Sequence, residues 1–316
     1  MCIEDLDTFS RGLRGLTFTH AVAECIGCRR SPGAIASWWR QQHPGCPWEK
    51  RWQMERLRAG ANIEESVLAD LCGLSVELSD LYNSPLWRTV SNLMTARACD
   101  ELLDTVRVGG KRLDSKIGTF SELLLDRVDL PCLPIHLALL FSGHYSYGIY
   151  RSLLTKNFTY MYAWCGVQYP FGHIRAQLHE QLSLYFQESL RPWPRGWAGW
   201  EVFQQLYLYQ IEELNSWGWL GGHAGCLAML VWNLSDKECS SLDYCLGKNI
   251  EEWPVPMPVA FEKKWQRKWT VWEENPVSLN GIECPLPDVH GGAERMSVGM
   301  LNQLKVISLV DPAVDF

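Results

Sequence analysis

Ile174-Arg-Ala-Gln-Leu178-His-Glu-Gln-Leu182-Ser-Leu-Tyr185 is the stretch of sequence that most clearly sets the fold class. Its residues Ile174, Leu178, Leu182 and Tyr185 follow one another at intervals of four, four and three positions. This spacing places them on one face of an α-helix. The prolines of residues 191–194 come next and cannot continue a helix. The sequence therefore predicts a helix over residues 174–190 with one buried stripe.

Helical spacing recurs along the chain, whereas the alternation typical of strands is scarce. We expect helices over residues 66–71, 93–106, 120–128, 135–154, 200–214 and 261–272. The pair Gly109-Gly110 interrupts this pattern and is the candidate domain boundary. The prediction is a mostly α-helical protein with a small N-terminal helical module, residues 1–110, and a larger helical body, residues 111–316. In the body, a proline-rich extended segment crosses residues 253–258, and an irregular tail begins at Val277.

Composition narrows the function classes. Hydrophobic residues make up 47% and charged residues 21% of the 316, which is typical of a folded globular protein. The net charge of −7 argues against coating nucleic acid with the whole surface. Its apolar runs are shorter than the roughly 20 residues that cross a bilayer, and the acidic N-terminus does not resemble a secretory signal. We expect a cytoplasmic protein with reduced cysteines and no membrane partner.

Two pairs of metal-ligand residues stand near the N-terminus. Cys25-Ile-Gly-Cys28 is followed, after fourteen intervening residues, by His43-Pro-Gly-Cys46. Structural zinc takes four thiolate or imidazole ligands, commonly in pairs separated by two residues. The pattern predicts that Cys25, Cys28, His43 and Cys46 bind Zn²⁺ as a zinc knuckle. In the alternative interpretation they are ordinary thiols, since residues 31–42 between the pairs read as a helix that needs no metal.

A helix-turn-helix pattern covers residues 64–82. In it, Ala69 is expected at the close contact of the first helix, and Gly73 is the expected left-handed residue that ends this helix. Ser75 is the expected N-cap of the second helix. Before Tyr82, that helix lacks the arginine, lysine, asparagine and glutamine side chains that contact base edges. The pattern therefore favours a helix-turn-helix shape more strongly than it favours recognition of DNA bases by the second helix.

Two segments combine basic and aromatic residues. Residues 29–60 contain seven basic and two acidic residues together with four tryptophans. Residues 261–272 contain a tryptophan stripe that has lysine and arginine on either side. Basic groups neutralise phosphate while flat rings stack on bases, so the combination suits nucleic acid, whereas exposed tryptophan also suits a protein partner. The candidate binding residues are Arg29, Arg30, Arg40, Arg51, Lys263, Lys264, Trp265, Arg267, Lys268 and Trp269. The competing interpretation is a tryptophan core beneath a solvated charged face.

The common enzyme motifs are missing from the sequence. The chain has no Walker lysine motif, no G-x-G-x-x-G, no H-E-x-x-H and no G-x-S-x-G. The leading hypothesis is therefore a non-enzymatic interaction protein, an adaptor or regulatory subunit that docks a protein or nucleic-acid partner. The alternative is an enzyme that binds a small-molecule substrate in a helical pocket lined by histidine and tyrosine. Its candidate residues are His136, His144, His173 and His179.

Overall fold

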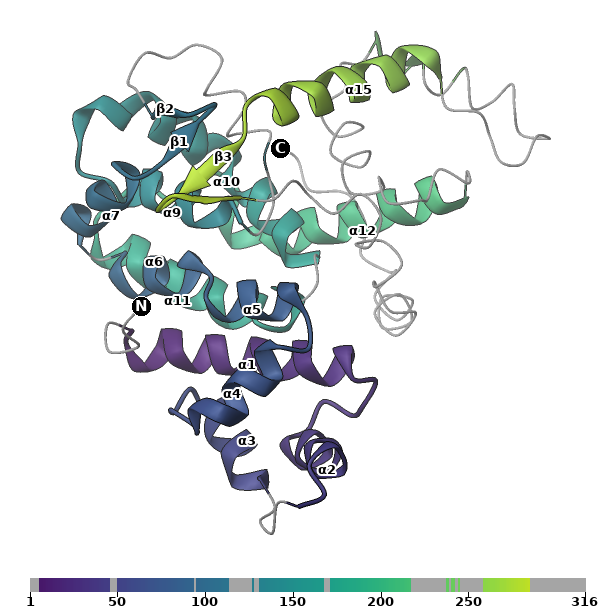
Figure 1. Cartoon of the computed structure of the whole chain (residues 1–316). Coiled ribbons are helices and arrows are strands. Elements are labelled where there is room, and N and C mark those ends of the chain that lie inside the picture. The colour runs from purple at the N-terminus through teal and green to yellow at the C-terminus, as the bar shows by residue number, and fades with distance from the viewer. Residues whose placement is uncertain are drawn as a thin grey trace. The chain divides into compact units, whose positions relative to one another are not determined.

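A computed structural model describes residues 6–45, 50–93, 95–113, 127, 131–167, 171–216, 237, 238, 240, 241, 244 and 258–284 (Figure 1). The chain divides into two compact units. The first contains Met1–Gln204 and Trp272–Pro285, and the second contains Gln205–Val271 and Leu286–Phe316. The described residues are predominantly helical, which confirms the predicted mostly-α class.

The elements of the first half are the helices α1 Thr8–Cys25, α2 Pro32–Gln42, α3 Arg51–Arg58, α4 Glu65–Cys72, α5 Val76–Tyr82, α6 Pro85–Asn92 and α7 Ala96–Leu103, followed by the strands β1 Arg107–Val108 and β2 Lys111–Arg112. The later elements are α9 Leu133–Phe141, η2 Tyr145–Tyr147, α10 Gly148–Val167, η3 Phe171–His173, α11 Arg175–Glu188, η4 Trp197–Gly199, α12 Trp200–Ser216, α15 Val259–Glu274, β3 Val277–Leu279 and β4 Ile282–Glu283.

Local sequence explains where the N-terminal helices begin. The Asp7 carboxylate accepts a hydrogen bond from the Ser10 amide at 2.6 Å and so caps α1. Ser31 caps α2 and Ser84 caps α6, each directly before a proline at the first helical position. That position needs no amide hydrogen, which is why proline is favoured there.

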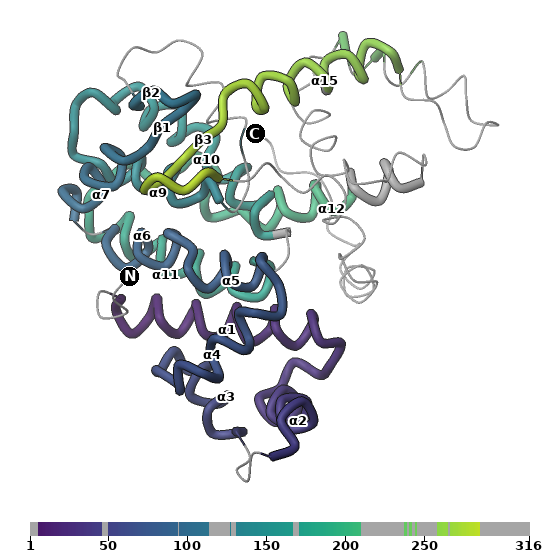
Figure 2. Tube along the Cα trace, in the orientation of Figure 1, coloured from purple at the N-terminus to yellow at the C-terminus, as the bar shows by residue number. Residues whose placement is uncertain are grey.

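In the first unit, α1 lies between α3 on one side and α5 and α6 on the other (Figure 2). Phe18 and Val22 of α1 are fully buried there. The α11 stripe predicted from the sequence is confirmed, because Ile174, Leu178 and Leu182 are fully buried.

Tryptophan forms part of the core. Trp197 and Trp200 are buried, and the His179 ring stacks on both, with ring centroids 4.4 and 5.1 Å apart. The Trp197 indole N–H donates to the Ser183 hydroxyl at 2.8 Å, so its polar atom is satisfied. An aromatic core rich in tryptophan is therefore present in this unit.

A small antiparallel sheet in the order β2-β1-β3-β4 joins distant parts of the sequence. Val108 pairs with Val277, both buried, so the chain returns to its first half at β3. Gly109 and Gly110 form the turn between β1 and β2, with φ of 56° and 74°. Such short strands carry little periodicity, so the expectation of irregular chain from Val277 was wrong for β3 and β4.

The prediction of one helix over residues 135–154 was wrong, because the structure has two helices there, α9 and α10. Ser142 adopts an extended conformation after α9, and the chain restarts through η2 into α10. Apolar residues on both sides of the break are buried in one core, because α9 packs against α10. Among the described residues, none of the helices combines the length and the apolar character that a membrane span needs.

Candidate functional site

The N-terminal basic segment lies on α2, α3 and the loop before α2. Gly15 of α1 and Gly60 after α3 let these two helices approach at backbone distance, and Gly60 has a φ of 76° that favours glycine. The helix α2 packs against α3. This close crossing fixes α3, and through it α2, on the side of α1.

We define the basic surface as the exposed residues Arg29, Arg30, Arg40, Arg51, Arg56 and Arg58. Two of them have carboxylate partners, Arg30 with Glu24 at 3.2 Å and Arg51 with Glu55 at 3.0 Å. Both pairs are solvent-exposed and therefore contribute little to stability. The segment thus displays more positive than negative charge to solvent.

The tryptophans of this segment differ in exposure. Trp39 is 5% exposed, whereas Trp52 is 50% exposed and has the Arg56 guanidinium 5.7 Å from its ring centroid. Trp38 has intermediate exposure, and Trp48 lies outside the described residues. Among the tryptophans of this segment that the structure describes, Trp52 has the most exposed ring, which is a poor stacking platform for several bases but a good anchor for one pocket.

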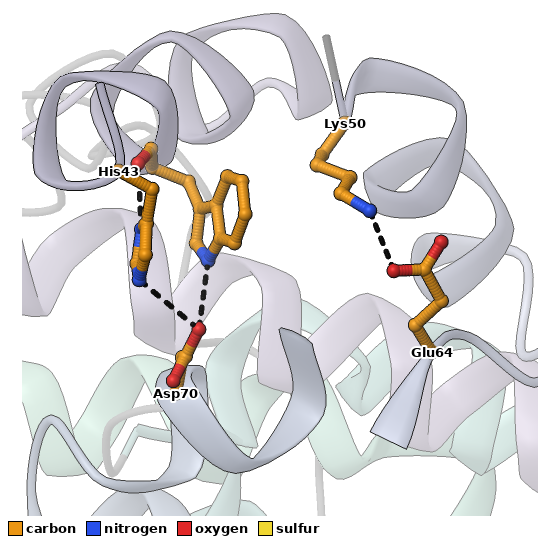
Figure 3. A network of polar contacts seen from close by, with 5 residues as sticks. His43, Lys50, Glu64 and Asp70 are labelled. Carbon is orange, nitrogen blue, oxygen red and sulfur yellow. Dashed lines mark hydrogen bonds and ion pairs between the residues drawn. The ribbon is translucent and has the colours of Figure 1, made fainter. Parts of the chain in front are cut away.

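Beside the basic surface, Asp70 of α4 connects α2 to α4 (Figure 3). Its carboxylate oxygen Oδ2 accepts from the Trp39 indole N–H and lies the same 3.3 Å from Nε2 of His43. The His43 ring stacks on Trp39, with centroids 4.1 Å apart, and its Nδ1 lies 3.0 Å from the Trp39 carbonyl oxygen. Both ring nitrogens of His43 therefore face acceptor oxygens.

Lys50 and Glu64 continue this network at the start of α3 and α4. Their ammonium and carboxylate groups are 2.5 Å apart, and the Lys50 nitrogen lies 5.7 Å from the Trp39 ring centroid. Hydrogen bonding to Lys50 lowers the pKa of the Glu64 carboxyl. Asp70 and Glu64 could not be predicted from the sequence, because no spacing rule connects them to His43 or Lys50.

The structure describes three of the four predicted zinc ligands. Cys25 is exposed at the end of α1, and Cys28 is half-buried, with its thiol 3.2 Å from the Arg29 carbonyl oxygen. Burial raises the pKa of the Cys28 thiol, which opposes formation of the thiolate that zinc needs. His43 binds Asp70, and Cys46 lies outside the described residues. Within the described ranges, no three His, Cys, Asp or Glu side chains gather as a metal site.

The second basic segment forms α15. Lys263 and Arg267 are exposed, whereas Lys264 pairs with Glu238 at 3.1 Å. Phe261 is buried in the second unit, and Lys268 and Trp269 have intermediate exposure. The side chain of Trp265 lies outside what the structure describes. Part of the predicted stripe therefore faces inward, and part of its charge is neutralised.

The histidines proposed for an enzyme pocket lie in separate surroundings. His136 is buried in α9, His144 is exposed before η2, and His179 lies between Trp197 and Trp200. His173 contacts His20 edge to face, with centroids 4.5 Å apart. His43, predicted from the sequence as a metal ligand, pairs instead with the Asp70 carboxylate.

The helix pair α4 and α5 occupies the predicted helix-turn-helix segment. Ser75 caps α5 as expected, accepting from the Leu78 amide at 3.2 Å. Two details were wrong: Gly73 has an ordinary helical φ of −71°, and Ala69 is exposed. The turn is made by residues 73–75 without a left-handed residue.

Comparisons with known proteins add no template for this arrangement. No protein-family model, no curated protein and no solved structure matches the chain. The inference of function therefore depends on the residues of the site themselves.

Proposed function

We propose that this protein is an interaction protein that docks an acidic segment of a partner protein on its basic surface. The observation that carries the proposal is Trp52, half exposed on α3 between Arg51 and Arg56. Tryptophan and arginine are the residue types that most often dominate binding energy at protein interfaces. The surrounding arginines complement acidic side chains, and the Trp52 ring supplies an apolar anchor.

The burial of the neighbouring tryptophan favours a protein over a nucleic-acid partner. A single strand is held by several stacked rings, yet Trp39 is turned inward and bonded to Asp70. We further propose that α4 and α5, although they have the order of a helix-turn-helix, serve as a scaffold. In this proposal, Asp70 holds α2 in place for the partner.

The test measures fluorescence anisotropy with the full chain and two labelled probes, a peptide of alternating glutamate and leucine and a single-stranded oligo(dT). At about 0.15 M salt, we expect saturable binding of the peptide and much weaker binding of oligo(dT). Trp52→Ala should weaken peptide binding by about tenfold or more. The matched control is Trp193→Ala, which removes a tryptophan of similar exposure, 47%, outside the basic surface.

Salt distinguishes the partner classes. Binding anchored by Trp52 should persist in part when arginine contacts are screened, since burial of apolar surface is insensitive to salt. Tight oligo(dT) binding that falls steeply with salt would instead indicate a nucleic-acid partner. If neither probe binds, or if Trp52→Ala and Trp193→Ala behave alike, the proposal is wrong.

A further inference from the structure

A cavity lies in the first unit, away from the residues assigned to docking. It has a volume of about 310 Å³ and is lined by Leu93, Ala96, Phe141, Ser189, Leu190 and Arg191. The cavity forms where α9 ends early and the chain leaves α11. Its volume is at the lower end of the range of about 300–1,000 Å³ found for small-molecule sites. The lining surface is about half polar and half apolar, with Arg191 as the charged side chain among these six residues.

Arg191 is anchored but has hydrogen-bonding capacity left. Its Nη2 donates to the Phe141 carbonyl oxygen at 3.3 Å. A guanidinium has five N–H donors. In the part of the chain that the structure describes, no carboxylate forms an ion pair with Arg191. The anchored guanidinium therefore keeps N–H donors for an acceptor, and no carboxylate among the described residues forms an ion pair with it.

A second arginine increases the positive charge near the cavity. Arg151 of α10 donates to the carbonyl oxygens of Ser142 and His144. Its pKa is lowered first by burial and then by the charge of Arg191. The nearby carboxylate of Asp100 already accepts from the Ser142 hydroxyl and, at 3.4 Å, from the His144 amide. Two positive charges, those of Arg151 and Arg191, thus lie near the one negative charge of Asp100.

Leu190 has an unusual conformation at the rim. Its φ is 53°, in the left-handed region where helix ends usually place glycine, and its side chain is 92% exposed. Neither the backbone conformation nor the packing of this chain favours leucine at that position. An apolar side chain at the rim of a cavity with a partly apolar lining is, however, suited to cover the body of a ligand.

We propose that this cavity binds a small amphipathic anion, with its carboxylate or similar head at Arg191 and its apolar body against Leu93, Phe141 and Leu190. The charge of Arg191 selects the head, and the apolar half of the lining selects the body. The site is independent of the docking surface and would operate whether or not that surface has a partner.

The experiment is a methyl NMR titration of the full chain, labelled at leucine and alanine, with octanoate and with 1-octanol. The two probes share a chain length and differ in the charged head. We expect octanoate to shift the methyl signals of Leu93, Ala96 and Leu190 saturably. The affinity for 1-octanol should be lower by about tenfold or more. Equal affinity for both probes, or no saturable shift of these methyls, would overturn the proposal.

Variants assign the roles of the two residues. Arg191→Met keeps an unbranched apolar stem but removes the guanidinium, so it should weaken octanoate binding about tenfold while leaving 1-octanol binding unchanged. Its control is Arg195→Met, which removes an exposed arginine from the same segment. Leu190→Gly should weaken octanoate binding but leave Tm unchanged or raise it by about 2 °C, because glycine suits a positive φ. The proposal is contradicted if Arg191→Met leaves the octanoate affinity unchanged, or if Arg195→Met lowers it equally. If Arg191→Met does not fold, the comparison of octanoate with 1-octanol on the wild type decides.

Discussion

Gly15 of α1 packs directly against the carbonyl group of Leu57 in α3, so closely that a β-carbon at Gly15 would lie 1.9 Å from the Leu57 oxygen. Gly12, three residues earlier in the same helix, has nothing within 4 Å of the same position. The two glycines thus have opposite roles, although the sequence makes them look alike.

We expect Gly15→Ala to lower the free energy of unfolding by about 3 kcal/mol, because the backbone of α3 has to move away. The matched control, Gly12→Ala, should raise it by about 0.5–1 kcal/mol, because alanine favours a helix over glycine. Urea denaturation of both variants measures the difference. Similar effects at the two positions would contradict the close crossing of α1 and α3.

The pair His20 and His173 should make the protein sensitive to acid. Burial lowers the pKa of both rings, that of His173 from 6.5 to about 4, and the charges of Arg30, Arg58 and Arg175 act in the same direction. Both pKa values lie below those of the unfolded chain, so the neutral rings are favoured in the folded state. The stabilisation is therefore complete above pH 6.5 and is lost as the pH falls through about 4.

Replacing His173 by glutamine removes one of these titrations. Between pH 7 and pH 4, the free energy of unfolding of His173→Gln should fall by about 1–2 kcal/mol less than that of the wild type. This value is reduced for solvent screening, because the His173 ring is only half-buried. Urea denaturation at several pH values tests this. An acid-induced loss of the same size in both proteins would show that the pair does not contribute.

The contact between His43 and Asp70 should show a modest coupling energy. Their side chains are 38% and 43% exposed, and exposed pairs contribute about 0.2–1 kcal/mol. A double-mutant cycle with His43→Gln and Asp70→Asn measures the coupling, which should decrease when salt screens the pair. A coupling near zero at low salt would mean that stacking on Trp39 alone positions His43.

The zinc hypothesis for Cys25, Cys28, His43 and Cys46 predicts one bound ion, and binding would require His43 to release Asp70. Elemental analysis of protein purified without added metal tests it. Less than about a tenth of an equivalent of zinc in folded protein would exclude a structural site, which binds one ion with four ligands. If zinc is present, chelation should loosen the N-terminal helices, because metal binding is coupled to folding.

Much of the helical framework could be predicted from local sequence. The stripe on α11, the cap at Ser75 and the start of α2 at Ser31-Pro32 depend on contacts between residues a few positions apart. Such contacts follow from the 3.6-residue period and from capping chemistry, which a single sequence displays directly.

The arrangement of the site depended on tertiary structure. Nothing local indicates that Asp70 meets His43, that Arg191 reaches the Phe141 carbonyl, or that β3 pairs with β1. Trp39 is buried and Trp52 is half exposed. This difference in exposure could not be predicted from the sequence, because both residues follow helical spacing beside basic residues. Which ring faces solvent is decided by the elements that pack against the helix, and these come from distant parts of the chain.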